Sequence, residues 1–162
     1  LLSEGKTIVV KLQEHLVSEY EKNVISTFIT MKTILSTFIR GKEEYPLRCN
    51  LWIDEIYQIP TVENVINEYL NRLRKMGLKI ILTVHRLTQL NNTKFQKELL
   101  SSGASFSLLA GCKEVHFRDF QEYTGDFTLE DVINLKPFHA LHIIHTNKNG
   151  DWIGTTKLPD KK

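Results

Sequence analysis

The sequence predicts an α/β protein with a mostly parallel sheet, helices on both faces of the sheet and a C-terminal antiparallel hairpin. Strand-like apolar runs alternate along the chain with segments whose apolar residues recur at helical spacing, an order that specifies a parallel sheet. Leu51-Trp52-Ile53 also lacks the polar alternation of a strand with one solvated face, so we expect a strand buried on both faces. Asn149-Gly150 lies between the last two strand-like runs and is a strong hairpin signal.

Length and composition are those of an ordinary globular domain. The 162 residues, 41% hydrophobic and 25% charged, suffice for one domain over 1–162. No apolar run approaches the roughly 20 residues of a transmembrane helix, and no signal-peptide pattern is visible. A net charge of +2 does not by itself indicate nucleic-acid binding. Cys49 and Cys112 lie far apart in strand-like surroundings, which favours reduced core thiols. Because the chain begins at Leu1 rather than Met, we expect a fragment of a longer protein.

The N-terminal residues have two interpretations. Gly5-Lys6-Thr7 is also the tail of a P-loop, but that motif requires another Gly five residues earlier and a helix after the Thr. The residues that follow are β-branched, which favours a turn leading into a strand over 7–12.

The remaining elements follow from periodicity and from turn and capping residues. In the first half we expect a helix over 18–40 closed by Gly41, a strand over 49–55, a helix from an N-cap at Thr61 to Met76 closed by Gly77, and a strand over 78–84. In the second half we expect a polar loop over 88–93, a helix over 94–101, a fourth strand over 104–110, helices over 113–123 and 129–135, and strands over 139–145 and 151–156.

Two adjacent carboxylates, Asp54 and Glu55, follow the apolar strand directly. An ionised carboxylate at the end of a buried strand is costly unless it is paired or holds a metal. Ligands of open α/β sheets bind outside the carboxyl ends of the strands, so the pattern is typical of the Walker B segment of a Mg²⁺-nucleotide site. The alternative is that both acids simply face solvent where the strand ends.

The next strand ends at Thr83-Val84-His85-Arg86. If the intervening helix is a right-handed crossover, this end lies beside the end of the strand that carries the two carboxylates. We therefore expect Thr83, His85 and Arg86 to line the same crevice.

Four stretches in a fixed order carry a family resemblance: the run over 4–10, the strand Leu51 to Glu55, the helix end Arg72-x-Arg74-x-x-Gly77, and the strand ending at Val84. In this order the chain resembles the C-terminal half of the RecA-like motor domain of the FtsK/HerA superfamily. Within that superfamily it looks most similar to conjugative coupling proteins and type IV secretion ATPases. The resemblance implies a RecA-like P-loop NTPase fragment.

The resemblance also implies ATP and Mg²⁺ as cofactors, and roles for five residues. Asp54 would hold Mg²⁺ through a water, and Glu55 would be the catalytic base. Thr83 and His85 would contact the nucleotide; the family often has Gln where this chain has His85, whose imidazole also donates or accepts a hydrogen bond. Arg86 is a candidate for the arginine that a neighbouring subunit supplies to the transition state. Competing candidates are Arg72, Arg74 and Arg118.

The wider implication is a homo-hexameric, ATP-driven pump that moves DNA or a secreted substrate through a central channel. Its partners would include secretion or membrane-complex components, and its place would be the cytoplasm, at the inner face of the membrane. A catalytically inactive docking or assembly module derived from a motor domain is the alternative. Another P-loop NTPase, such as a helicase or a division translocase, is a third possibility.

The main departure from the family is the P-loop, of which only a possible tail is present. Walker A amides and lysine supply most of the phosphate cradle. We therefore expect that the first half of the motor lies outside this chain, and that the chain alone does not turn over ATP. A Gly-x-x-x-x-Gly-Lys-Ser/Thr pattern encoded upstream of Leu1 would distinguish the motor from the docking module.

Other charged or ionisable groups are weaker candidates. His139 and His145 lie on one face of the expected strand about 20 Å apart, with His142 on the other face, so the three histidines do not predict a metal site. Glu130-Asp131 is expected at a helix start, where acidic residues favour the helix dipole.

A DNA-contacting loop is most plausible over 88–97, where Lys94 and Lys97 lie. Solvated surface lysines are the alternative interpretation. The large aromatic residues that we assign to core packing include Phe28, Phe38 and Trp52.

Overall fold

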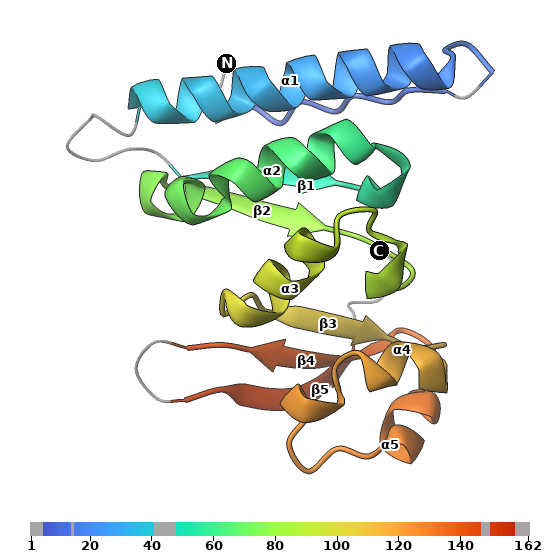
Figure 1. Cartoon of the computed structure of the whole chain (residues 1–162). Coiled ribbons are helices and arrows are strands. Elements are labelled where there is room, and N and C mark those ends of the chain that lie inside the picture. The colour runs from blue at the N-terminus through green and yellow to red at the C-terminus, as the bar shows by residue number, and fades with distance from the viewer. Residues whose placement is uncertain (1–4, 14, 41–47, 147–149, 158–162) are drawn as a thin grey trace. The chain divides into compact units, whose positions relative to one another are not determined.

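A computed structural model describes residues 5–13, 15–40, 48–146 and 150–157, and the fold is α/β (Figure 1). The chain divides into two compact units, Leu1–Glu98 and Leu99–Lys162. Each unit has its own sheet, a parallel pair in the first and an antiparallel sheet in the second.

The first unit is built on two parallel strands and the helix that connects them. Its elements are α1 (Glu19–Arg40), β1 (Cys49–Ile53), the 3-10 helix η2 (Ile56–Gln58), α2 (Pro60–Leu73), the 3-10 helix η3 (Arg74–Met76), β2 (Leu78–Leu82), the 3-10 helix η4 (Leu87–Gln89) and α3 (Thr93–Ser101), whose last residues belong to the second unit. Cys49 pairs with Leu78 and Ile53 with Leu82, so the strands run in full register.

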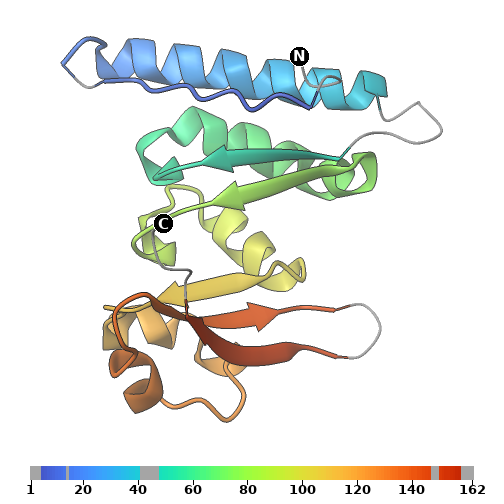
Figure 2. The same cartoon turned by 180° about the vertical axis from the view of Figure 1, so that it is seen from behind.

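Helix α2 covers one face of this strand pair. It lies in front of β1 and β2 in Figure 1 and behind them in Figure 2. The core between the helices and the strands is formed by Ile34 of α1, Leu73 of α2 and Leu78 of β2, with Leu51 and Ile80 packed against it. Every second strand residue therefore faces the helices, as the pleat requires.

The opposite face of the strand pair is exposed, so the expected burial on both faces is wrong. β1 alternates between half-buried and exposed residues, and Trp52 is 67% exposed. Trp52 pairs in register with Ile81, so both lie on the face that α2 does not cover. The physical reason is that, among the described residues of this unit, no helix covers that face (Figure 2). Phe28, at 61% exposed, is a second wrong core assignment, whereas Phe38 packs edge-on against Tyr69 as expected.

The expected strand over 7–12 is also wrong. Residues 6–13 have no regular structure and run along α1 in both views, and Val9 is 83% exposed. A β-branched run becomes a strand only where a neighbouring strand accepts its backbone hydrogen bonds. Within the described residues, β1 pairs only with β2. Gly5 adopts a positive φ of 66°, as expected of a turn, and no helix follows Thr7 directly.

The ends of α2 agree with the expected helix, except for its cap. Pro60 is the first helical residue, a position where proline is favoured, so Thr61 lies inside the first turn rather than at the N-cap. The Thr61 hydroxyl instead bonds across to α1, at 3.1 Å from Asn23 Oδ1 and 2.8 Å from Thr27 Oγ1. Gly77 ends the helical segment at a φ of 76°, which glycine adopts without strain.

The second unit is a three-stranded antiparallel sheet with short helices. Its elements are β3 (Phe106–Leu109), α4 (Glu114–Arg118), the 3-10 helix η5 (Gln121–Tyr123), α5 (Leu129–Ile133), β4 (His139–Ile144) and β5 (Trp152–Lys157). β3 pairs antiparallel with β4, and β4 pairs antiparallel with β5. The C-terminal hairpin is confirmed, although residues 147–149 at its turn lie outside the described residues. The expected parallel pairing of the strand over 104–110 is wrong, because its hydrogen-bonding partner is the hairpin.

Among the residues that the structure describes, no helix is both long and apolar enough to span a membrane.

Candidate functional site

The carboxyl ends of β1 and β2 meet, as the sequence predicts. The strands remain hydrogen-bonded past their last paired residues, since Thr83 N donates to Ile53 O at 3.1 Å. Parallel strands in register end at the same edge, which brings Asp54 and Thr83 side by side.

The hydroxyl of Thr83 joins the two carboxylate residues. It donates to Oδ1 of Asp54 and accepts from the backbone N–H of Glu55 at 2.9 Å. Thr83 therefore fixes the end of β1 through a side chain as well as through the backbone. Of the two acids, Asp54 is the more exposed.

Glu55 has a strained backbone. Its φ of 48° and ψ of 48° lie in the left-handed region, which costs a residue other than glycine about 1–3 kcal/mol. The chain turns here from β1 into η2, where Ile56 is fully buried. The strain persists because the backbone is held on both sides: Thr83 Oγ1 accepts from Glu55 N, and Thr83 O accepts from Ile56 N at 3.4 Å.

Both carboxylate oxygens of Glu55 have partners. Oε1 lies 2.9 Å from His85 Nε2, and Oε2 accepts from Gln58 Nε2. The His85 ring also packs near Tyr57, with ring centroids 5.9 Å apart. The side chain of Glu55 is 38% exposed and that of His85 is 67% exposed, so water reaches both.

Gln58 is a member of this cluster that the sequence analysis missed. Its amide oxygen accepts from Nζ of Lys22 in α1 at 2.5 Å, while its amide nitrogen donates to Glu55. The sequence alone predicts a loop over 57–60. The signal was its spacing, three residues after Glu55, which one turn of 3-10 helix brings back to the carboxylate.

Glu63 is a second missed residue, and it is fully buried. Its Oε2 accepts from the backbone amides of Asn91 at 2.8 Å and Asn92 at 3.1 Å, and its Oε1 accepts from the Asn91 side chain at 2.9 Å. The Asn91 side chain also donates to the backbone oxygen of Tyr57 at 3.0 Å. Glu63 thus ties α2 to the segment that follows His85. A buried carboxylate is stable only when hydrogen-bond donors surround it. The position of Glu63 within the apolar pattern of this helix was therefore the sequence signal for such a contact.

Among the candidate arginines whose side chains the structure describes, none has a described contact with the cluster. Arg86 follows His85, is exposed, and its backbone amide donates to Gln89 Oε1 at 3.0 Å. Arg72 is exposed on α2, and Arg118 pairs with Glu114 one helical turn away at 2.5 Å. The side chain of Arg74 lies outside the described part of the chain.

Two groups of the cluster are oxygen donors of the kind that magnesium binds. Asp54 offers an exposed carboxylate and Thr83 a hydroxyl beside it, and hard oxygen ligands are those that Mg²⁺ prefers. Mg²⁺ usually takes only one or two protein carboxylates and completes its shell with water and substrate phosphates. Within the described residues, no group of three histidine, cysteine or acidic side chains is close enough to hold a metal ion.

The three histidines of the hairpin have separate partners. His139 Nδ1 lies 3.1 Å from Pro137 O, and His145 Nδ1 lies 2.7 Å from Asp151 Oδ1. His142 is hydrogen-bonded on both sides, to hydroxyls of the neighbouring strands. Each ring therefore has a local structural role.

The expected DNA-contacting loop is shorter than predicted. Residues 87–89 form η4, and α3 begins at Thr93. Lys94 lies on α3, exposed, with its Nζ 3.7 Å from Oε1 of Glu98. DNA contact by this segment stays a prediction.

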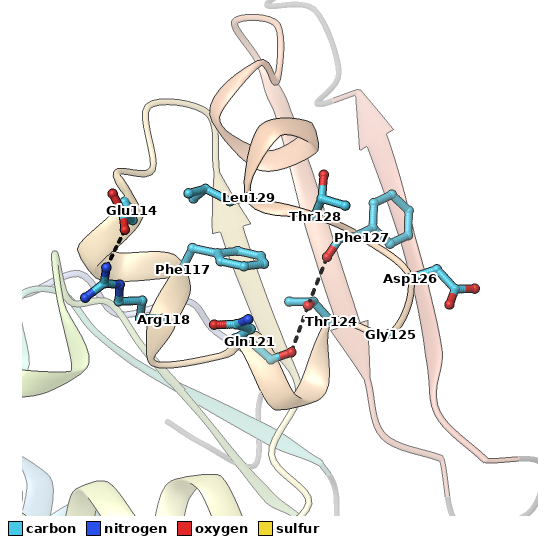
Figure 3. Close-up of a pocket in the computed structure, with 10 residues that line it drawn as sticks. All are labelled: Glu114, Phe117, Arg118, Gln121, Thr124, Gly125, Asp126, Phe127, Thr128 and Leu129. Carbon is cyan, nitrogen blue, oxygen red and sulfur yellow. Dashed lines mark hydrogen bonds and ion pairs between the residues drawn. The ribbon is translucent and has the colours of Figure 1, made fainter.

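A pocket of about 500 Å³ in the second unit is a separate candidate (Figure 3). It is lined by residues of α4, η5 and the turn before α5, with Phe117 and Leu129 among them. Some of its polar groups bond to one another: Arg118 pairs with Glu114, and the buried Thr124 hydroxyl lies 3.0 Å from Gln121 O. This arrangement is typical of a folded turn.

Both cysteines are free, and burial raises the pKa of the Cys112 thiol above its ordinary value. A raised pKa leaves less thiolate at neutral pH, so this side chain is a poor nucleophile.

Comparison of the chain with models of known families, with curated proteins and with solved structures finds no match.

Proposed function

We propose that the chain is part of an ATP-driven motor that translocates DNA or a type IV secretion substrate, and that the cluster at the ends of β1 and β2 contributes to ATP hydrolysis. One observation carries the proposal: two adjacent carboxylates end a strand whose parallel neighbour supplies a hydroxyl and an imidazole in direct contact with them. Such an edge is where α/β sheets bind nucleotides.

Each residue has a chemical role under this proposal. Asp54 would hold Mg²⁺ through a water, and Thr83 orients the Asp54 carboxylate. When bound, the metal neutralises charge on the phosphates. Glu55 accepts a proton from the attacking water. His85, which contacts Glu55, would exchange this contact for one with the γ-phosphate.

The P-loop of this motor would be supplied by another part of the protein. The exposed face that carries Trp52 is the surface we assign to that part, because a motor sheet is covered on both faces. The motor would act as a homo-hexamer, with DNA or a secreted substrate in its channel, at the cytoplasmic face of a membrane complex.

A docking or assembly module that no longer hydrolyses ATP is the second candidate function. The observation that favours it is that both Glu55 oxygens are already bonded to protein groups. Under this reading the cluster stabilises the turn after β1 and has no chemical task.

ATP turnover by the longest native form of the protein tests the proposal. We expect Glu55→Gln and Asp54→Asn each to lower kcat by about 100-fold or more, because one loses the general base and the other the carboxylate that holds the metal through a water. Glu68→Gln, on the exposed face of α2, is the matched control and should leave kcat unchanged. Turnover that survives Glu55→Gln would place catalysis elsewhere.

A further inference from the structure

We infer that Gln58 is a positioning residue for Glu55 and that Lys22 of α1 holds Gln58 in place, an inference that rests on the proposed ATP hydrolysis. The three side chains form a continuous hydrogen-bond chain: Lys22 Nζ donates to Gln58 Oε1 at 2.5 Å, and Gln58 Nε2 donates to Glu55 Oε2. Lys22 lies in α1, Gln58 lies in η2, and Glu55 lies in the turn between β1 and η2.

The amide of Gln58 gives this chain a fixed direction. A primary amide donates only through its nitrogen and accepts only through its oxygen. The ammonium of Lys22 can only donate, so it selects the orientation in which the Gln58 oxygen faces Lys22. The nitrogen must then face Glu55, where the acceptor is a carboxylate oxygen.

This contact decides which oxygen of Glu55 is available. His85 lies against Oε1 and Gln58 against Oε2. His85 is the more exposed partner and sits on a separate strand end, so it is the one that can leave when a phosphate competes for it. Gln58 lies in the same tight turn as Glu55 and stays, which leaves the carboxylate oriented with Oε1 toward the reacting water.

The anchor on α1 is itself held by further contacts. Asn23 Oδ1 and Thr27 Oγ1, on the same end of that helix, both bond to Thr61 at the start of α2. These contacts fix the helix end against the start of α2. The backbone position of Lys22 relative to Gln58 is therefore fixed as well.

The activity test compares kcat and KM for ATP in the longest native form. A misplaced catalytic group lowers the rate of the chemical step but leaves substrate binding unchanged. We therefore expect Gln58→Met to lower kcat about 10- to 100-fold with little change in KM. Lys22→Met should lower kcat less, Lys22→Arg should restore most of that loss, and the Gln58→Met/Lys22→Met pair should lose no more than Gln58→Met alone. Lys32→Met is the control on the same helix, since Lys32 lies over the Phe28 ring instead.

The second readout needs no activity. In the ¹⁵N-labelled chain, Glu55→Gln and Lys22→Met should each shift the side-chain amide signals of Gln58, whereas Lys32→Met should not. Gln58 side-chain amide signals that do not shift in Glu55→Gln would show that the contact between Gln58 and Glu55 does not exist, and would overturn the inference. Turnover that depends on Glu55 but not on Gln58 would overturn the inference alone, while no turnover in any form would overturn the proposed function together with it.

Discussion

Glu55 is held in a left-handed backbone conformation at the point where its carboxylate meets His85 and Gln58. Glu55→Ala and Glu55→Gly both remove the carboxylate, but only glycine adopts this conformation without cost. We therefore expect the Gly variant to be more stable than the Ala variant by about 1 kcal/mol in urea unfolding.

The same pair of substitutions at Glu68, in the middle of α2, is the control. There the order should reverse, because alanine favours a helix over glycine by about 1 kcal/mol. An Ala variant at Glu55 as stable as the Gly variant would contradict the strained turn.

Glu63 is the buried acceptor of three N–H groups from Asn91 and Asn92. Glu63→Ala leaves these donors without their acceptor, so the free energy of unfolding should fall by at least about 2 kcal/mol. Glu68→Ala, exposed on the same helix, should change it by less than about 0.5 kcal/mol. Equal effects of the two variants would argue against the buried contacts.

The candidate site was predictable in part at the scale of residues. Asp54, Glu55, Thr83 and His85 could be placed because each lies within three residues of a strand end and parallel strands end together. The position of Gln58 could not be predicted from the ends of the strands, because its role depends on the turn that follows β1 and on a contact with the distant helix α1.

Short capping motifs set the ends of two helices. Ser18 and Glu21 bond reciprocally at the start of α1, and Thr128 and Asp131 do so at the start of α5. The pKa of Glu21 is lowered, first by the hydrogen bond from the Ser18 side chain, and the pKa of Asp131 is lowered, first by the hydrogen bond from the Thr128 backbone. The expected helix-start role of Asp131 is confirmed.

The lowered pKa of Asp131 gives a pH dependence with a definite sign. A carboxylate whose pKa is lower in the folded state than its ordinary pKa of 3.8 stabilises the fold at pH values above that ordinary pKa. This stability is lost as the pH falls through the folded-state pKa. Wild type should therefore be more stable than Asp131→Asn at about pH 7, and the difference should shrink below about pH 4. Urea unfolding at both pH values measures this, and a difference that stays constant would contradict the capping contact.

Elements were predictable where their signal is local. Helical spacing was enough for α1, and Asn149-Gly150 was enough for the hairpin, because neither depends on a distant partner. The strand expected over 7–12 and the parallel pairing expected of β3 failed for the opposite reason. Composition reports that a segment suits a sheet, but not which strand it pairs with.

At the scale of the whole molecule, each unit contains its own sheet, and the site belongs entirely to the first. The α/β class is confirmed, whereas the motor family stays a proposal. The 162-residue chain on its own should show no ATP turnover, because the described residues of the site offer carboxylates, a hydroxyl and an imidazole but no amide cradle of the P-loop kind. Turnover by this chain above that of its Glu55→Gln variant would contradict this expectation.

The most direct test of the account is ATP turnover by the longest native form, measured with and without DNA, beside its Glu55→Gln variant. The account predicts turnover that rises with DNA and is abolished by that single substitution. ATP turnover that does not change with DNA would contradict the translocation of DNA. Turnover that Glu55→Gln leaves intact would contradict the assignment of this cluster to ATP hydrolysis.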